Sequence, residues 1–133
     1  MMITNGVDIV SIERISKSLE RSGEAFLRRI CTEQELTLMG SANEVRRAEF
    51  LAGRFAAKEA IAKALGTGLG IMGVALTDME ILREGAGAPY VKLHGPVLAL
   101  YEERGGKHLS ISISHDGGMA VAFCCIEWEE RES

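Results

Sequence analysis

The longest helical pattern in the sequence runs from Arg46 to Leu65 and limits the folds open to this chain. The segment is rich in Ala, Leu, Glu, Lys and Arg, which are strong helix formers, and Gly66 follows it as a typical helix end. A chain of 133 residues has the usual size of one compact domain. We therefore expect a single domain, residues 1–133, organised around this helix.

Short segments on both sides of the helix have strand patterns. Strands are predicted at residues 6–10, 79–82, 90–93, 109–114 and 120–127. Shorter helices are predicted from Ser11, at 26–30, after Thr32 and at 97–104. Residues 115–118 are expected to turn the chain between the last two strands, and a glycine-rich loop is expected at 66–70. The predicted fold class is α+β, a mostly antiparallel sheet packed with a long helix.

The three cysteines, Cys31, Cys124 and Cys125, show neither a disulfide framework nor metal-ligand spacing. The last two are adjacent on a predicted strand, where their side chains point to opposite faces. The longest apolar run, from Met119 to Ile126, is too short to cross a membrane, and the N-terminal residues show no secretory pattern. We expect a cytoplasmic protein with no membrane partner.

The charge distribution bears on possible partners. The net charge of −4 argues against a nucleic-acid partner. Residues 1–63 nevertheless hold ten basic and nine acidic side chains, whereas residues 64–133 hold five and ten. On the helix predicted after Ser11, the basic residues Arg14, Lys17 and Arg21 share a stripe nearly opposite the apolar one. An acidic macromolecule can therefore dock on the first half of the chain.

Asp8 interrupts the otherwise apolar segment Val7–Val10. A carboxylate buried by such neighbours is costly unless it is paired or bound to a metal. The alternative is a residue near the strand end that faces water or caps the following helix.

Glu59 and Lys63 are neighbours on the long helix, and a surface ion pair worth about 0.3–0.5 kcal/mol is the ordinary explanation. Their stripe also contains Ala52 and Phe55, however, which places Glu59 at the border of a packed face. A carboxylate there and a second at Asp8 suggest a site for a hard cation such as Mg²⁺. Carboxylates alone do not distinguish Mg²⁺ from Mn²⁺ or Ca²⁺.

His115 stands where a predicted strand opens onto a turn. A histidine there can bind phosphate or act as a general acid or base, although a lone histidine at a turn more often does neither.

Taken together and in order, these features resemble the holo-acyl-carrier-protein synthases, which are 4′-phosphopantetheinyl transferases. The matching segments are Gly6–Val10 (GVDIV), Phe50–Ala60 (FLAGRFAAKEA), Gly87–Val91 (GAPYV) and Ser112–His115 (SISH), with Arg54–Gly68 the most specific. The resemblance covers the chain from Gly6 to Glu127. Two positions depart from it: many members begin Gly-x-Gly-x-Asp-Ile, where this chain has Thr4 and Asn5 before Gly6, and His115 is followed by Asp116 rather than Thr or Ser.

The resemblance implies transfer of 4′-phosphopantetheine from coenzyme A to a serine of apo-acyl carrier protein, with release of adenosine 3′,5′-bisphosphate, in support of fatty acid biosynthesis. Asp8 and Glu59 would hold Mg²⁺ beside the coenzyme A pyrophosphate. Glu59, directly or through a metal-bound water, would accept the serine proton, and Lys63 would neutralise the leaving phosphate.

For coenzyme A itself, the resemblance implies phosphate contacts from Arg54 or Lys58, from Lys63 and from His115. Gly87 and Pro89 would border the nucleotide.

The resemblance further implies a homotrimer with active sites at subunit interfaces, and association would add core to a small chain. Arg14, Lys17 and Arg21 would bind the acidic carrier protein. Two other readings use the same residues: a catalytically idle scaffold that grips a carrier protein, and a Mg²⁺-dependent nucleotide hydrolase. The hydrolase reading leaves the basic stripe unexplained.

Overall fold

The computed structural model describes residues 1–67 and 74–130, so the loop predicted at 66–70 lies partly outside it. The elements in chain order are β1 (Met2–Ser11), α1 (Ile12–Ser22), α2 (Glu24–Ile30), α3 (Glu33–Met39), α4 (Glu44–Leu65), the 3-10 helix η2 (Leu76–Asp78), β2 (Met79–Arg83), β3 (Pro89–Leu93), α5 (Gly95–Glu103), β4 (Gly106–Asp116) and β5 (Met119–Trp128). Each predicted helix and strand is present, and most are longer than their patterns indicated.

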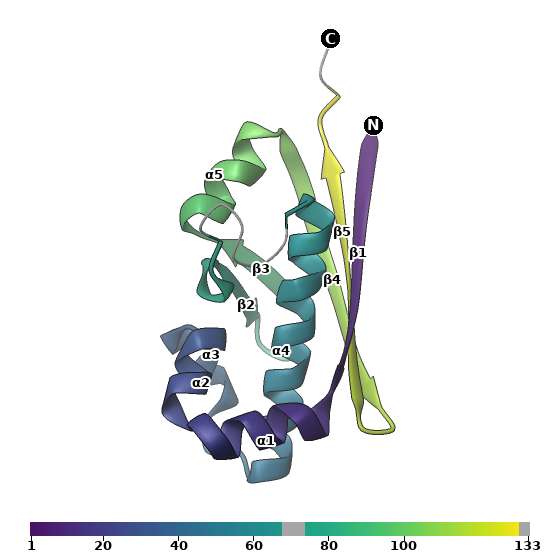
Figure 1. Cartoon of the computed structure of the whole chain (residues 1–133). Helices are drawn as coiled ribbons and strands as arrows, with labels where there is room; N and C mark the ends of the chain where they lie inside the picture. Colours follow the sequence, from purple (N-terminus) through teal and green to yellow (C-terminus); the bar gives the residue numbers. More distant parts are fainter. Residues whose placement is uncertain (68–73, 131–133) are drawn as a thin grey trace.

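Helix α4 lies across one face of a three-stranded antiparallel sheet with the strand order β1-β5-β4 (Figure 1). Strand β1 pairs with β5 along its whole length, from Met2 opposite Trp128 to Ser11 opposite Met119. Backbone pairing with β5 extends β1 beyond the predicted segment 6–10, which was based on the pattern of side chains alone. The predicted α+β fold is confirmed.

Local sequence signals set the helix ends. The Ser11 side chain accepts a hydrogen bond from the first turn of α1, and Thr32 and Glu35 form a reciprocal capping box at the start of α3. Helix α4 begins after Asn43, whose side chain caps it in the same way. It ends at Gly66, whose φ of 82° is in the left-handed region that favours glycine.

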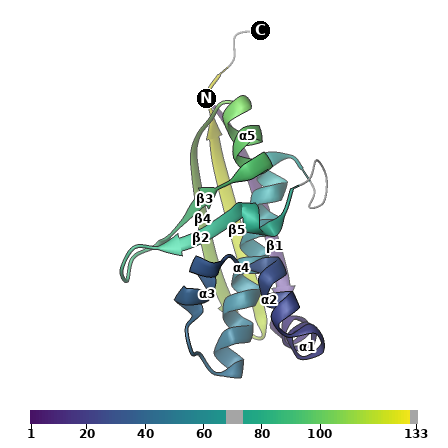
Figure 2. The ribbon, with the colours of Figure 1, turned by 90° about the vertical axis from the view of Figure 1, so that its left-hand side faces the viewer.

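Strands β2 and β3 form a separate two-stranded antiparallel sheet instead of extending the larger one (Figure 2). Pro89 pairs with Arg83 and is the first residue of β3, whereas the sequence predicted it in the preceding turn. A proline is tolerated at the start of a strand because the ladder there does not need its missing N–H.

The turn between β4 and β5 is tighter than the predicted turn 115–118. His115 and Asp116 belong to β4 and pair with β5, so that only Gly117 and Gly118 turn the chain. Their φ angles of 57° and 80° favour glycine. The backbone of His115 is therefore held by a sheet ladder rather than by a loop.

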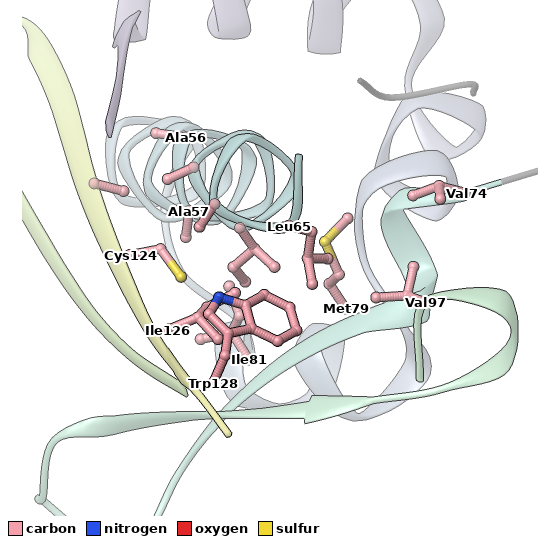
Figure 3. Close-up of a cluster of buried hydrophobic side chains, with 14 residues drawn as sticks. Ala56, Ala57, Leu65, Val74, Met79, Ile81, Val97, Cys124, Ile126 and Trp128 are labelled. Carbon is pink, nitrogen blue, oxygen red and sulfur yellow. The ribbon is translucent and has the colours of Figure 1, made fainter. Parts of the chain in front are cut away.

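The main buried cluster lies between α4, the inner face of the three-stranded sheet and β2 (Figure 3). Trp128 is 3% exposed within it, and its ring packs against that of Tyr101 with 5.8 Å between the centroids. A second cluster, which includes Ile15 and Leu51, packs α1 and α2 against α4. None of the helices formed by residues 1–67 and 74–130 combines the length and the apolar character that crossing a bilayer requires.

The opposite face of the three-stranded sheet carries exposed apolar side chains, which we call the outer sheet patch: Val7, Ile9, Val121 and Phe123. They are 36–62% exposed, and the pairing register places Val7 beside Phe123 and Ile9 beside Val121. No helix of the described part of the chain covers this face (Figure 1).

Candidate functional site

Asp8 and Glu59 line one cavity of about 460 Å³ between β1, α1 and α4, here the Asp8–Glu59 cavity. Alternate residues of β1 face α4, and Asp8 is one of them, with a side chain only 19% exposed. The strand approaches the helix closely because Gly6 has no side chain: a Cβ there would lie 2.0 Å from the Ala60 carbonyl oxygen. The structure therefore brings the two predicted carboxylates to one cavity.

Lys63 joins Asp8 rather than Glu59, its neighbour one helical turn away. Its Nζ donates to the Val7 carbonyl oxygen at 2.9 Å and to Asp8 Oδ1 at 3.3 Å. The Lys63 side chain is 54% exposed, so its ammonium group can also reach a ligand in solvent. The ion pair predicted from helical spacing alone is therefore replaced by one between α4 and β1.

The pKa of the Glu59 carboxyl is raised above its ordinary value. Burial is the largest cause, the negative charge of Asp8 is the second, and the positive charge of Lys63 opposes both. Two carboxylates that repel each other in one cavity favour a cation between them.

The donor set of this cavity fits a small divalent cation. Mg²⁺ usually takes one or two protein carboxylates and completes its octahedron with water and phosphate oxygens. Asp8 and Glu59 supply two such donors, and within residues 1–67 and 74–130 no cluster of three or more His, Cys, Asp or Glu side chains forms a closed metal cage. An open site of this kind leaves coordination positions for a substrate.

Arg54, Pro89 and His115 line a second cavity of about 620 Å³, here the Arg54–His115 cavity. Arg54 is buried, and its guanidinium carbon lies 4.3 Å from the centre of the Phe50 ring. Its Nη2 donates to the Ile81 carbonyl oxygen at 3.3 Å, while the buried Nε has no hydrogen-bond partner. Burial lowers the pKa of Arg54 from its ordinary value.

Sequence reasoning missed three charged residues that line this second cavity: Arg46, Glu49 and Arg83. Glu49 Oε2 lies 3.2 Å from His115 Nδ1 and orients the imidazole. Arg46 and Glu49 are three residues apart on one side of α4, and this spacing was the available signal.

The two cavities lie on different sides of α4. At about 100° per residue, Arg54 and Glu59 point about 140° apart around the helix axis. Asp8 belongs to β1 and His115 to β4, the two edge strands of the sheet, about 10 Å apart across β5. One chain therefore holds the predicted site residues in two separate cavities.

Lys58 does not reach either cavity. It is fully buried, where its Nζ donates to Glu35 Oε1 at 2.7 Å and to the Ile30 carbonyl oxygen. The expected phosphate contact from Lys58 is therefore replaced by a structural ion pair. Gly87 also lies outside the lining of the Arg54–His115 cavity, in the turn before β3, where its N–H donates to the Glu84 carbonyl oxygen at 2.8 Å.

The basic stripe lies on the exposed side of α1, opposite the buried Ile15. Lys17 pairs with Glu13 at 3.3 Å, which reduces its contribution to the positive potential. Arg14 also lines the Asp8–Glu59 cavity, so one end of the stripe borders the candidate site.

Comparison with known proteins identifies the family of the chain. The family model of the 4′-phosphopantetheinyl transferase superfamily matches residues 5–124. The holo-[acyl-carrier-protein] synthase of Shewanella frigidimarina is 46% identical over 122 residues, which cover 92% of this chain and 94% of that protein.

Solved structures share the fold. The crystal structure of the holo-[acyl-carrier-protein] synthase from Neisseria meningitidis superposes with a TM-score of 0.81 at 40% identity, covering 95% of this chain and 99% of that one. The Helicobacter pylori enzyme in complex with coenzyme A gives a TM-score of 0.79 at 35% identity, covering 95% and 100%. The chain belongs to the 4′-phosphopantetheinyl transferase superfamily, as an enzyme of its holo-[acyl-carrier-protein] synthase group.

Proposed function

We propose that this chain transfers 4′-phosphopantetheine from coenzyme A to a serine hydroxyl of apo-acyl carrier protein, with a divalent cation, Mg²⁺, at Asp8 and Glu59. The observation that carries the proposal is the convergence of Asp8 and Glu59, from two elements distant in sequence, at one open cavity, with Lys63 hydrogen-bonded to Asp8 beside it. A protein that only binds an acidic partner does not need two carboxylates and a lysine beside the surface on which that partner docks.

The proposed reaction is a displacement at the β-phosphorus of coenzyme A. Glu59 accepts the proton of the carrier serine while the serine oxygen forms a bond to phosphorus. The bond from phosphorus to the bridging oxygen breaks, and adenosine 3′,5′-bisphosphate leaves. Lys63, with an exposed ammonium group beside Asp8, neutralises charge on the leaving phosphate.

The cation has a limited, electrostatic role in this proposal. When bound by Asp8 and Glu59, it would neutralise the pyrophosphate and polarise its oxygens. The raised pKa of Glu59, caused by burial and by Asp8, supports this assignment, because a cation removes the repulsion between the two carboxylates.

The Arg54–His115 cavity is proposed to hold the nucleotide end of coenzyme A. Arg54 and His115 offer N–H donors to phosphate, and Pro89 offers an apolar surface to the nucleoside. The complex of the Helicobacter pylori relative with coenzyme A supports coenzyme A as the substrate here.

We propose that the Asp8–Glu59 cavity and the Arg54–His115 cavity are each part of one site, and that they complete each other in a cyclic homotrimer. The Asp8–Glu59 cavity borders edge strand β1, and His115 lies on the other edge strand, β4. A contact between two different edges is heterologous, and it closes into a ring of three when each subunit is rotated by one third of a turn from the next. The outer sheet patch supplies apolar area for such an association.

Phe123→Asp, which places a charge in the outer sheet patch on the middle strand β5, is expected to convert the trimer to monomers, because burying an unpaired carboxylate at an apolar interface is strongly unfavourable. Sedimentation velocity would measure the change. Coenzyme A affinity should fall with it, since each site needs two chains. Val45→Asp, at a side chain 69% exposed on the first turn of α4, is the matched control and should remain a trimer. A wild-type chain that sediments as a monomer would contradict the assembly.

The exposed basic stripe Arg14, Lys17 and Arg21 is proposed to bind the acidic carrier protein. Arg21→Glu is expected to raise the KM for the carrier about tenfold at low salt, with a smaller effect at high salt, and to leave the KM for coenzyme A unchanged. Adding Arg14→Glu should strengthen the effect. Lys107→Glu makes the same change of charge at the start of β4 and serves as the control. Equal loss of affinity for both substrates in Arg21→Glu would mark the stripe as structural.

The proposed function is tested by incubating the protein with Mg²⁺, coenzyme A and an apo-carrier protein and then determining the mass of the carrier. A mass gain of one phosphopantetheine group supports the transferase. Consumption of coenzyme A without a carrier would instead indicate a hydrolase, and no change in either substrate would indicate a binding scaffold.

The wider setting is proposed from the same features. A carrier protein as acceptor supports a role in fatty acid biosynthesis. Free cysteines, of which Cys31 and Cys124 are buried with thiol pKa values raised by burial to about 12, are compatible with the cytoplasm.

A further inference from the structure

Thr4 connects three elements, β1, α4 and β5, and lines a cavity together with Lys63. Its hydroxyl donates to the Ala64 carbonyl oxygen at 2.7 Å and accepts a hydrogen bond from Trp128 Nε1 at 2.8 Å. Ala64 lies in the last turn of α4, where carbonyl groups lack partners within the helix. Trp128 is buried, so its indole N–H also needs a partner. One hydroxyl group therefore satisfies two groups from α4 and β5.

The same strand and the same helix carry the reacting groups. Thr4 and Asp8 are on the inner face of β1, and Lys63 directly precedes Ala64 in α4. Lys63 donates back to β1 at the Val7 carbonyl oxygen, 2.9 Å away. The Thr4 hydroxyl thus joins the strand to the helix, while the Lys63 ammonium group joins the helix to the strand. Both contacts depend on the position of β1 along the axis of α4.

We propose that Thr4 is a positioning residue for the transfer reaction, which holds β1 in register on α4 and so fixes the contact between Lys63 and Asp8. This inference rests on the proposed function of the Asp8–Glu59 cavity. Thr4 acts through Lys63 and contacts no reacting atom. A glycine at this position would offer no hydroxyl for either hydrogen bond.

Two substitutions at Thr4 separate the effect of its hydroxyl group from the effect of its side-chain shape. Thr4→Val keeps the volume and loses both hydrogen bonds, whereas Thr4→Ser keeps the hydroxyl. We expect Thr4→Val to lower kcat/KM for coenzyme A about tenfold, because small displacements of catalytic groups are costly in rate. The KM for the carrier protein should not change, since the basic stripe is on α1. Thr4→Ser should restore the rate.

The chain has a single tryptophan, which provides a direct readout of the hydrogen bond. The indole N–H resonance of Trp128 should shift and exchange faster with solvent in Thr4→Val, and should remain close to its wild-type position in Thr4→Ser. In a double-mutant cycle, Thr4→Val should cost little further activity in a Lys63→Met background, because both changes affect the same contact.

Val97→Ala provides a control for loss of stability alone. Val97 is fully buried on α5, which packs on η2 and β4, away from β1. This variant should lose stability but keep kcat/KM at a temperature where it is folded. Wild-type activity in Thr4→Val, or additive losses with Lys63→Met, would overturn the role of Thr4. An inactive wild-type chain would instead overturn the proposed function on which that role rests.

Discussion

Replacing Glu59 with Gln is expected to lower kcat/KM by about 10²–10⁴-fold, the range that general-base catalysis contributes. The amide cannot accept the serine proton and is a poor ligand for Mg²⁺, so both proposed roles are lost together. Asp8→Asn should cause a loss of similar size through the cation alone. Steady-state kinetics of carrier modification, with Mg²⁺ varied, would measure both effects.

The fold should survive the Glu59→Gln substitution. Burial and Asp8 raise the pKa of Glu59, which means that the folded state disfavours its ionised form. A neutral amide therefore leaves the melting temperature unchanged or slightly higher. Glu102→Gln, on the exposed side of α5, is the matched control and should keep full activity. Unfolding of the Glu59 variant would mark that carboxylate as structural.

The pH dependence follows from the same shift. In the absence of a cation, the raised pKa means that Glu59 takes up its proton at a higher pH than an ordinary glutamate as the solution is acidified. Without a cation, the pKa of Glu59, followed by its carboxyl carbon resonance, should fall in Asp8→Asn because a like charge is removed. The stability of the fold also depends on pH. The folded state binds the Glu59 proton more tightly than the unfolded state does, so the contribution of Glu59 to the free energy of unfolding decreases as pH rises from the pKa of the unfolded state through that of the folded state.

Replacing Gly6 with Ala is expected to destabilise the chain by about 3 kcal/mol or more, which corresponds to a fall of about 10 °C in melting temperature. The added Cβ would lie 2.0 Å from the Ala60 carbonyl oxygen and 2.9 Å from the Ala64 backbone nitrogen. Backbone atoms cannot rotate away as a side chain can, so β1 must move off α4. Asp8 moves with it, and transfer activity should fall even where the variant remains folded.

Gly53→Ala is the matched control for stability. A Cβ at Gly53 would lie 3.1 Å from the terminal Cγ2 of Ile113, a side-chain atom that can shift, and alanine is the better helix former. The change in unfolding free energy should therefore stay within about 1 kcal/mol. Thermal melts of both variants would test the comparison, and equal losses would show that the approach of β1 to α4 is not the cause.

The sequence predicted the elements well where one local interaction decides them. Ser11, Thr32 and Gly66 mark helix ends through hydrogen bonds or backbone angles within a few residues, and all three do so in the structure. The hairpin after β4 was less accurate, because His115 and Asp116 are ordered by pairing with β5 and not by their own turn preference.

Both the residues and the contacts of the candidate site were predicted only in part. Asp8 and Glu59 do line one cavity, but Lys63 pairs with Asp8 across two elements rather than with Glu59 along the helix. Lys58, beside Glu59 in sequence, points instead into the core and pairs with Glu35. Neighbours on a helix differ by about 100° in direction, so adjacency in sequence does not indicate a shared site.

The sequence by itself determined which helices and strands form, the buried stripe of α1 and the types of residue at the site, because spacing within one element sets these features. Only the tertiary structure decided which residues meet. The docking of β1 on α4 at Gly6 joined Asp8 to Lys63, and the strand order placed Asp8 and His115 on opposite edges of the sheet. Such contacts depend on the direction in which distant elements pack, and no local pattern encodes that direction.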